Sequence, residues 1–311
     1  MKIAVIGGSG KMGKWLGRYL SGEGQEVLLI GRGGVKLEEA GWELGLPVAT
    51  GLEAAGDADA IVISVPIDCF EGVVRDIANF TAPEQVIMDV TSVKAMPVRA
   101  MHRYIKKGRV LGTHPVFGPG AAGVGGHNIV LTPSDEIEKA LAAKVKDWLE
   151  IRGAKVSVMP PEEHDELMAV ILGLAHFIAI VSGDTLVGLD RLRQMEAIGG
   201  VTYRVLLTLV ESVVSEDAGF YASLHMNLPN LAAVEERFIE SSRRWADIVR
   251  GGDRQAFARG MEEIKKALET DNPRFGDAYK AMYRVAGGRI KPPLEFSKNL
   301  PPNPPYNIDN K

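Results

Sequence analysis

Three features are scarce in this sequence of 311 residues: cysteine, long hydrophobic runs and blocks of basic residues. The single cysteine, Cys69, cannot form a disulfide within the chain, so nothing requires an oxidising compartment, and we expect it to be buried. Lysine and arginine number 36 against 40 aspartate and glutamate, a net charge of −4. Because no basic block is present to neutralise phosphates, we expect no nucleic-acid partner.

The most apolar stretch, 167–189, is interrupted by His176, Ser182 and Asp184. Its uninterrupted pieces are shorter than the ~20 residues that a membrane crossing needs, so we interpret it as a buried helix and expect no membrane partner. The N-terminal sequence MKIAVIGGSG lacks the charged and then apolar regions of a signal peptide. The sequence therefore predicts a cytoplasmic protein.

Short β-branched runs alternate with helical segments in the first half of the chain. This alternation predicts parallel strands joined by right-handed helical crossovers, a doubly wound α/β domain of residues 1–159. We expect strands at 3–6, 26–30, 60–65, 86–90, 109–112, 128–131 and 155–158, and helices at 11–21 and 134–152.

The second half changes in pattern after Pro160 and Pro161. Prolines are typical of the start of a helix, and beyond them apolar residues recur three and four positions apart. We therefore predict an all-helical domain of residues 160–290 and a proline-rich, extended tail of residues 291–311. Two apolar helix faces are predicted, at Leu206, Leu209, Val210, Val213 and Val214, and at Phe257, Met261, Ile264 and Leu268.

A glycine-rich turn, G-x-G-x-x-G, directly follows the first strand and opens the first helix. We expect Gly8 to permit the tight turn, Gly10 to let a pyrophosphate approach the backbone, and Gly13 to let the helix pack closely. The helix N-terminus offers free N–H groups to phosphates. This pattern predicts a Rossmann-type dinucleotide site; the alternative is the same turn without a ligand. The expected cofactor contacts are Gly8, Ser9, Gly10, Lys11, Met12 and Gly13.

The residue after the second strand indicates which nicotinamide cofactor is used. A carboxylate there would bind the ribose 2′-hydroxyl of NAD, whereas an arginine suits the 2′-phosphate of NADP. The sequence is Gly31-Arg32-Gly33-Gly34, without a carboxylate. We therefore predict NADP, bound by Arg32, with NAD as the alternative if Arg32 is only a solvated loop residue.

Polar residues follow two later strands. The strand at 109–112 leads to His114 and a rigid turn, and the strand at 86–90 leads to Ser92 and Lys94. Ligands of open α/β sheets bind outside the carboxyl ends of strands. A histidine there is either a general base or a structural residue, and the pattern alone leaves both interpretations open.

With these motifs in order, the chain resembles the prephenate and arogenate dehydrogenases of tyrosine biosynthesis over most of its length. The combination of HPVFGP, EHD and a later His-Phe pair is quite specific. The motifs are Gly8 to Gly13, VISVP at 62–66, DVTSVK at 89–94, GTHPVFGP at 112–119, EHDELM at 163–168, LAHF at 174–177, Tyr203-Arg204 and DAGFYASLHM at 217–226.

The resemblance implies oxidative decarboxylation of prephenate to 4-hydroxyphenylpyruvate by a monofunctional enzyme. The stretches 167–189 and 205–214 are apolar around most of their circumference, so one chain would struggle to cover them, and we predict a homodimer, as the resemblance also implies. The resemblance implies that His114 is the catalytic base for the 4-hydroxyl proton and that Ser92 orients His114 near that hydroxyl. His176 and Arg204 would bind the substrate, Arg204 as a planar partner for a carboxylate. The cofactor would also contact Ser64, Val65, Pro66 and Lys94.

Other details of the helical half are open. If 162–181 is one regular helix, Asp165, Ala169, Leu172 and His176 share a face. His164, at the start of that helix, has either a capping, an interface or a catalytic role. Ser212 stands where some bacterial relatives of this family carry a second substrate arginine.

Three alternative functions remain. The first is an arogenate dehydrogenase that produces tyrosine, and the second is a non-catalytic, NADP-sensing dimeric module. The third is a β-hydroxyacid dehydrogenase, which would need a helical-domain lysine that 167–186 lacks. Histidines and carboxylates do not stand at metal-ligand spacing, so we expect no metal.

Overall fold

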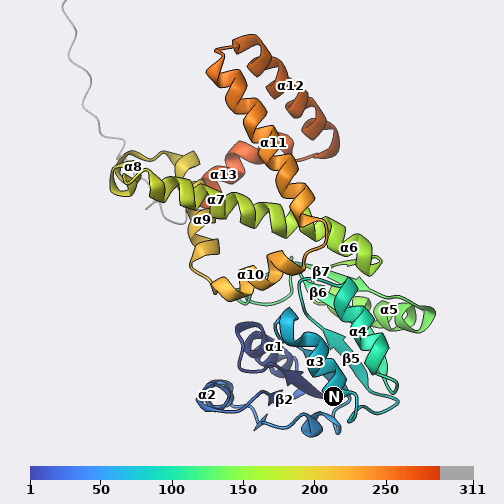
Figure 1. Ribbon diagram of the computed structural model, residues 1–311. Coiled ribbons are helices and arrows are strands. Elements are labelled where there is room, and N and C mark those ends of the chain that lie inside the picture. Colours follow the sequence, from blue (N-terminus) through green and yellow to red (C-terminus); the bar gives the residue numbers. More distant parts are fainter. Residues whose placement is uncertain (288–311) are drawn as a thin grey trace, which may run out of the picture. The chain divides into compact units, whose positions relative to one another are not determined.

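The structure is a computed structural model that describes residues 1–287, and it divides into two compact units (Figure 1). The first unit comprises Met1–Ile178 and Glu216–Ile239, and the second comprises Ala179–Ser215 and the residues from Glu240 onward. The predicted tail of residues 291–311 and the last residues of the predicted helical domain, 288–290, lie outside the described residues.

The first unit contains an eight-stranded sheet in the order β3-β2-β1-β4-β5-β6-β7-β8. All seven predicted strands are confirmed; β3 was not predicted, because two residues make no pattern. The pairs are parallel except β6 and β7, which are antiparallel because a loop rather than a helix joins them. The strands are β1 (Lys2–Ile6), β2 (Glu26–Ile30), β3 (Val48–Ala49), β4 (Ala60–Ile63), β5 (Val86–Asp89), β6 (Arg109–Pro115), β7 (Asn128–Thr132) and β8 (Lys155–Val158).

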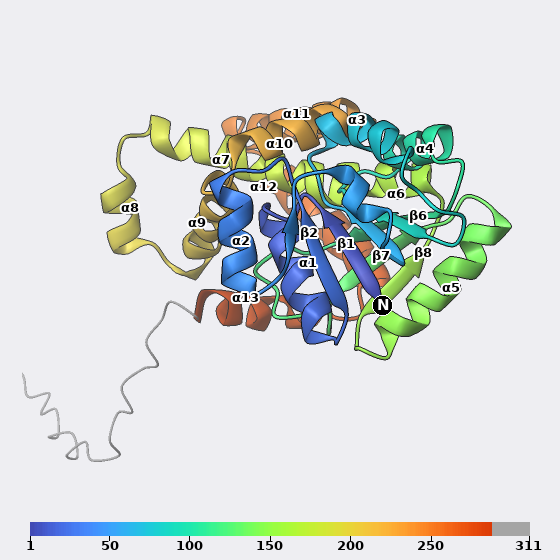
Figure 2. The same cartoon turned by 90° about the horizontal axis from the view of Figure 1, so that it is seen from below.

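Helices cover both faces of this sheet, which confirms the doubly wound α/β architecture (Figure 2). Alternate strand residues point to opposite faces, so Ala4 and Ile6 pack with α3 and α4, whereas Ile3 and Val5 pack with α1, α2 and α5. Both faces are buried, which explains the continuous apolar runs. These helices are α1 (Lys11–Gly22), α2 (Val35–Leu44), α3 (Ile67–Ile77), α4 (Ala95–Tyr104) and α5 (Glu136–Glu150).

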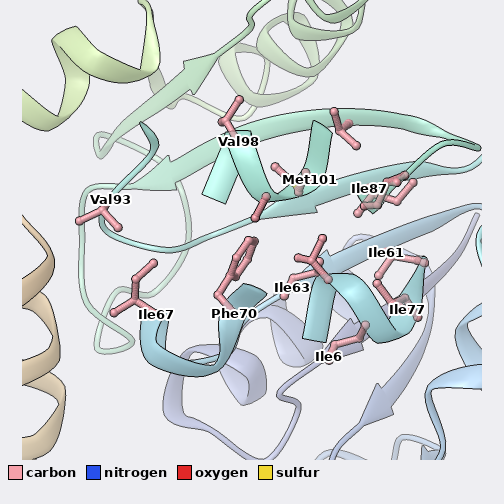
Figure 3. Close-up of a cluster of buried hydrophobic side chains, with 14 of the residues drawn as sticks. Ile6, Ile61, Ile63, Ile67, Phe70, Ile77, Ile87, Val93, Val98 and Met101 are labelled. Carbon is pink, nitrogen blue, oxygen red and sulfur yellow. The ribbon is translucent and has the colours of Figure 1, made fainter. Parts of the chain in front are cut away.

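One of the two apolar clusters lies between the sheet and α3 and α4 (Figure 3). Phe70, Val74 and Ile77 of α3 and Met101 of α4 are among its fully buried members. Cys69 is one residue away from this buried face and is exposed, so the prediction of a buried cysteine is wrong. Its thiol is 3.2 Å from the Pro66 carbonyl oxygen.

Helices from the second half of the chain belong to the first unit as well. Pro161 is the first residue of α6, as its position predicted. Met168, Leu224 and Leu231 join the apolar cluster under α3 and α4, so the first unit extends past residue 159. The segments are α6 (Pro161–Met168), the π-helical η2 (Ala169–Leu174), the start of α7 (Ala175–Gly188), α10 (Ala218–Asn227) and the start of α11 (Leu231–Arg250).

The second unit is entirely helical within the described residues. It contains the remainder of α7 and α11 with α8 (Leu192–Ile198), α9 (Val201–Val214), α12 (Arg254–Asp271), η3 (Phe275–Asp277) and α13 (Ala278–Gly287). The predicted face of α12 is exposed in the single chain, Met261 by 55% and Leu268 by 49%. These side chains need a partner surface if they are to be buried.

The helical stretch Pro161–Gly188 is long and apolar enough to cross a membrane by length and composition. Our prediction that 167–189 forms a buried helix is wrong for the single chain, because Ile171 is 51% exposed and Val187 is 65% exposed. The described elements of one chain do not cover these side chains. Such a stretch is also expected of a helix that another protein chain covers.

Candidate active site

The carboxyl ends of five neighbouring strands lie at one edge of the sheet. Ile6 of β1 is in register with Ile30 of β2 and Ile63 of β4, Ile63 with Asp89 of β5, and Asp89 with Gly112 of β6. The strands are parallel, so the segments that follow them emerge on the same side. The segments concerned are the glycine-rich turn, Arg32, Ser64 to Pro66, Ser92 to Lys94, and His114.

The turn between β1 and α1 depends on Gly7, which we did not single out from the sequence. Gly7 has a φ of +89°, and a Cβ there would lie 2.1 Å from the Ser64 carbonyl oxygen. Gly8 therefore has a different role from the one predicted, because its Cβ would meet Leu29 of β2 at 2.7 Å. Gly13 lets α1 start close to the turn, since its Cβ would lie 2.2 Å from the Gly7 carbonyl oxygen.

The N-terminus of α1 fits a phosphate group. Its N-cap, Gly10, is exposed and provides no side-chain cap, and the first turn has no acidic residue. The backbone N–H groups of the first turn are therefore available to an anion. Lys11 is exposed and its ammonium lies 2.5 Å from Glu216 Oε2, while Ser9 and Met12 are half-buried. The residues present thus fit the diphosphate of a dinucleotide.

Arg32 is exposed in the loop between β2 and α2. No ion pair or hydrogen bond of its guanidinium is found within residues 1–287, and the same is true of Lys36 in the first turn of α2. A cavity of about 390 Å³ opens beside this loop. Its lining includes Gly33, Gly34, Leu37, Glu38, Thr50 and Glu53. Arg32 in the loop and Lys36 at the start of α2 are therefore two cations without a partner among the described residues.

Three side chains form a buried chain of hydrogen bonds at the end of β6. His114 Nδ1 lies 2.8 Å from His164 Nε2, and His164 Nδ1 lies 2.8 Å from Asp165 Oδ1. The three residues are 3%, 0% and 2% exposed in that order. The strand end and the start of α6, 50 residues apart in sequence, thus meet at His114 and His164. The His164 role that the sequence left open is a direct contact with the predicted base.

Asp165 also fixes the start of α4. Its Oδ1 accepts a hydrogen bond from the Lys94 backbone N–H at 2.6 Å, and its Oδ2 accepts one from the Ala95 N–H at 2.9 Å. Both N–H groups belong to the N-terminus of α4, which favours a negative charge there. Asp165 thus links α4 and α6 at the site.

Lys94 and Asp89 form a fully buried ion pair beside Thr113, the residue before His114. The Lys94 ammonium donates to Asp89 Oδ2 and, at 2.6 Å, to the Thr113 carbonyl oxygen. Burial lowers the pKa of Lys94, and the Asp89 charge opposes that shift. The predicted contact of Lys94 with the cofactor is not supported, since its side chain is 0% exposed and its ammonium is held within the core.

His114 is held in its neutral form. Burial lowers its pKa well below the ordinary value of 6.5, and the nearby charges of Lys94 and His164 lower it further. A neutral imidazole has one nitrogen that donates and one that accepts a proton. Because Nδ1 is bonded to His164, Nε2 is the nitrogen left for a ligand at the strand end.

Ser92 lies on the turn after β5 and is half-buried. No hydrogen bond of its hydroxyl is found among the described residues, so its contact with His114 stays a prediction. Arg204 is exposed on α9, in the second compact unit, and its role as a substrate ligand also stays a prediction. Ser212 bonds to its own helix through the Leu209 carbonyl oxygen at 2.8 Å.

His176 belongs to a second group of aromatic side chains in the first unit. Its ring lies 4.8 Å from Tyr221, edge to face, and 5.8 Å from His225. Burial, and then the charge of His225, lower the pKa of His176 to about 4. His176 Nδ1 and His225 Nε2 are both buried without a protein partner within the described chain. These two nitrogens are therefore available to a polar ligand.

The predicted stripe from Asp165 to His176 is not regular. The π-helical η2 lies between them, and its wider turns shift the phase of the helix by about one residue. Across this segment, residues 12 positions apart therefore lie on one face, as residues 11 positions apart do in a regular α-helix. His164 is 12 residues before His176, so it shares a face with His176, whereas Asp165 does not. π-Helical turns are frequent at functional sites.

Sequence reasoning missed the roles of Asp89, His164, Asp165 and His225. The adjacent His-Asp pair in a half-apolar helix was the available signal, because polar side chains that become buried require hydrogen-bond partners. Within residues 1–287 no group of three or more histidine, cysteine or acidic side chains could hold a metal ion.

Two family models match successive parts of the chain. The family model "Prephenate dehydrogenase, nucleotide-binding domain" matches residues 16–158, and "Prephenate dehydrogenase, dimerization domain" matches residues 160–263. A "Probable arogenate/prephenate dehydrogenase" of Methanocaldococcus jannaschii is 32% identical over 278 residues, covering 88% of this chain. The match covers only 62% of that relative's length.

Two solved structures have the same fold. Prephenate dehydrogenase from Aquifex aeolicus, in complex with hydroxyphenyl propionate and NAD+, has a TM-score of 0.70 at 20% identity, covering 87% of this chain and 98% of the other. Synechocystis arogenate dehydrogenase has a TM-score of 0.67 at 18% identity, covering 88% and 100%.

Proposed function

Because this chain belongs to the prephenate and arogenate dehydrogenase family of oxidoreductases, we propose that it catalyses the oxidative decarboxylation of prephenate to 4-hydroxyphenylpyruvate. The observation that carries the proposal is the neutral, buried His114 at the end of β6, with one ring nitrogen left for a ligand. A base of this kind suits a reaction that removes a hydroxyl proton.

In the proposed reaction three bonds of the substrate break. The O–H bond at C4 of the substrate breaks and its proton goes to His114 Nε2. A nicotinamide cofactor, when bound, would supply the acceptor for the hydride that leaves C4 with the electron pair of the C4–H bond. The bond to the ring carboxylate breaks, carbon dioxide leaves, and the electron pair completes the aromatic ring. His114 then returns its proton to solvent.

The remaining predicted residues would bind and orient the reactants. The first turn of α1 and the glycine-rich turn would hold the diphosphate, with Ser64 to Pro66 beside them. Ser92 would form a hydrogen bond near the 4-hydroxyl and orient His114, and His176 and Arg204 would bind the polar groups of the substrate. We propose a homodimer that covers the exposed faces of α7 and α12, and a cytoplasmic location.

An assay with two substrates and two cofactors tests the proposed activity. We expect the purified chain to reduce NADP+ when prephenate is added, with release of carbon dioxide, and to do so faster than with arogenate. Arogenate turnover alone would support the alternative arogenate dehydrogenase instead. Cofactor binding without turnover of either substrate would contradict the enzyme and favour a non-catalytic sensing module.

Arg32→Asp is expected to shift cofactor preference from NADP+ toward NAD+. The guanidinium of Arg32, which follows β2, would pair with a 2′-phosphate, and Lys36 would add a second cation. A carboxylate repels that phosphate and accepts a hydrogen bond from a 2′-hydroxyl. The measurement is the ratio of kcat/KM for the two cofactors.

Lys107→Asp is the matched control for this change. It alters the charge by the same amount on an exposed residue before β6, at the opposite edge of the sheet. The control should leave the ratio as in the wild type. An unchanged ratio in Arg32→Asp as well would mean that Arg32 does not contact the ribose phosphate.

A further inference from the structure

We propose that His164 and Asp165 are positioning residues that fix the ring tautomer of His114, so that Nε2 always presents a lone pair to the substrate hydroxyl. The inference rests on the proposed role of His114 as the base. It adds a function for the buried His-Asp pair, whose contacts with His114 the proposed reaction does not itself require.

Both carboxylate oxygens of Asp165 accept hydrogen bonds from backbone N–H groups. The Lys94 and Ala95 backbone N–H groups are donors that cannot change their role. The carboxylate therefore faces His164 Nδ1 as an acceptor, and Nδ1 must carry the proton. A neutral His164 then has its lone pair on Nε2.

The position of the proton on His164 in turn determines the tautomer of His114. His164 Nε2 is an acceptor 2.8 Å from His114 Nδ1, so His114 carries its proton on Nδ1 and its lone pair on Nε2. The opposite tautomer would place two lone pairs face to face at this distance. His164 is 0% exposed, so solvent offers no replacement partner for a nitrogen left unpaired there, and an unpaired buried polar group is unfavourable.

The arrangement also bears on the protonated state of the base. The Lys94 charge and burial disfavour a positive His114, as the lowered pKa reflects. When His114 gains the substrate proton, its Nδ1–H still donates toward His164, whose other side faces the Asp165 carboxylate. This line of dipoles ending in a negative charge stabilises the imidazolium that forms during the reaction.

Two substitutions of His164 separate tautomer control from simple packing. His164→Phe keeps a planar ring of similar size but removes the acceptor for His114 Nδ1–H. His164→Gln places an amide oxygen near the position of Nε2 and restores that acceptor. We expect kcat to fall ~10–100-fold in the Phe variant with KM little changed, and to recover largely in the Gln variant. Equal losses in both variants, or none in either, would contradict the proposal.

A spectroscopic readout tests the tautomer without reference to activity. The chain has six histidines, so ¹⁵N-histidine labelling gives few ring signals, and His114→Asn identifies those of residue 114. Long-range ¹H–¹⁵N correlations at neutral pH should show His114 protonated on Nδ1 in the wild type. Protonation on Nε2 in the wild type would overturn the inference, whatever the activity of the two His164 variants.

A control variant and His114→Asn distinguish a failure of the proposed base from a failure of the positioning role. His102→Phe removes another histidine with a carboxylate partner, Glu138 Oε1 at 2.7 Å, and should leave kcat unchanged. If His114→Asn keeps full activity, the proposed base is wrong, yet the wild-type tautomer is still measurable. If His114→Asn is inactive but the wild-type ring is protonated on Nε2, the base stands and the positioning role fails.

Discussion

His114→Asn is expected to lower kcat by ~10²–10⁴-fold, the range typical of a positioned general base. The asparagine side chain reaches about as far as Nδ1 of histidine, so its amide can still donate to His164 Nε2. The substitution therefore removes the proton acceptor and preserves the buried hydrogen bond. Cofactor binding should survive, because the glycine-rich turn follows β1 whereas His114 lies on β6.

The pH dependence of the wild type provides an internal check on this result. Only the neutral imidazole accepts a proton, so the rate should rise with pH as His114 loses its proton and then level off. Because the pKa of His114 is lowered, this limb should lie below pH 6.5. The limb should vanish in His114→Asn. A mutant with wild-type kcat would mean that His114 is structural.

The sequence predicted the fold well because the relevant signals are local. The β-branched runs that became β1, β4 and β5 are buried on both faces, and such burial leaves a continuous apolar pattern. The antiparallel β6–β7 pair was missed because its direction depends on a loop rather than on a strand pattern. The prediction of a buried helix at 167–189 was wrong for the single chain because apolar composition does not say whether the same chain or another one covers a helix.

The candidate site was only partly predictable, since its contacts join distant segments. His114 could be chosen because it ends a strand at the edge where such sheets bind ligands. Its partner His164 is 50 residues away, and no local pattern states that α6 starts beside β6. Lys94 was placed on the cofactor because it follows a strand end, whereas its side chain turns back into the core to meet Asp89.

That buried pair leads to the largest expected effect on stability. Lys94→Met is expected to lower the free energy of unfolding by ~3–5 kcal/mol, because it leaves the Asp89 carboxylate buried without its counter-ion. Two hydrogen bonds to Asp89 remain in this variant: the Thr91 hydroxyl donates at 2.6 Å and the Thr113 backbone N–H donates at 3.2 Å. These neutral donors do not balance the charge of the carboxylate. Urea unfolding of the wild type and variant at neutral pH measures the difference.

Two further variants show whether the loss comes from an unpaired charge or from the lysine stem. Lys139→Met breaks an exposed pair with Glu136 and should leave the free energy of unfolding nearly unchanged, since water screens such pairs. Replacing both partners, Lys94→Met with Asp89→Leu, removes the unpaired charge and should recover part of the stability lost in Lys94→Met. A double variant no more stable than Lys94→Met would mean that the lysine stem and its hydrogen bond to the Thr113 carbonyl oxygen, rather than the unpaired charge, account for the loss. A Lys94→Met variant within ~1 kcal/mol of the wild type would contradict the expected cost of an unpaired buried carboxylate.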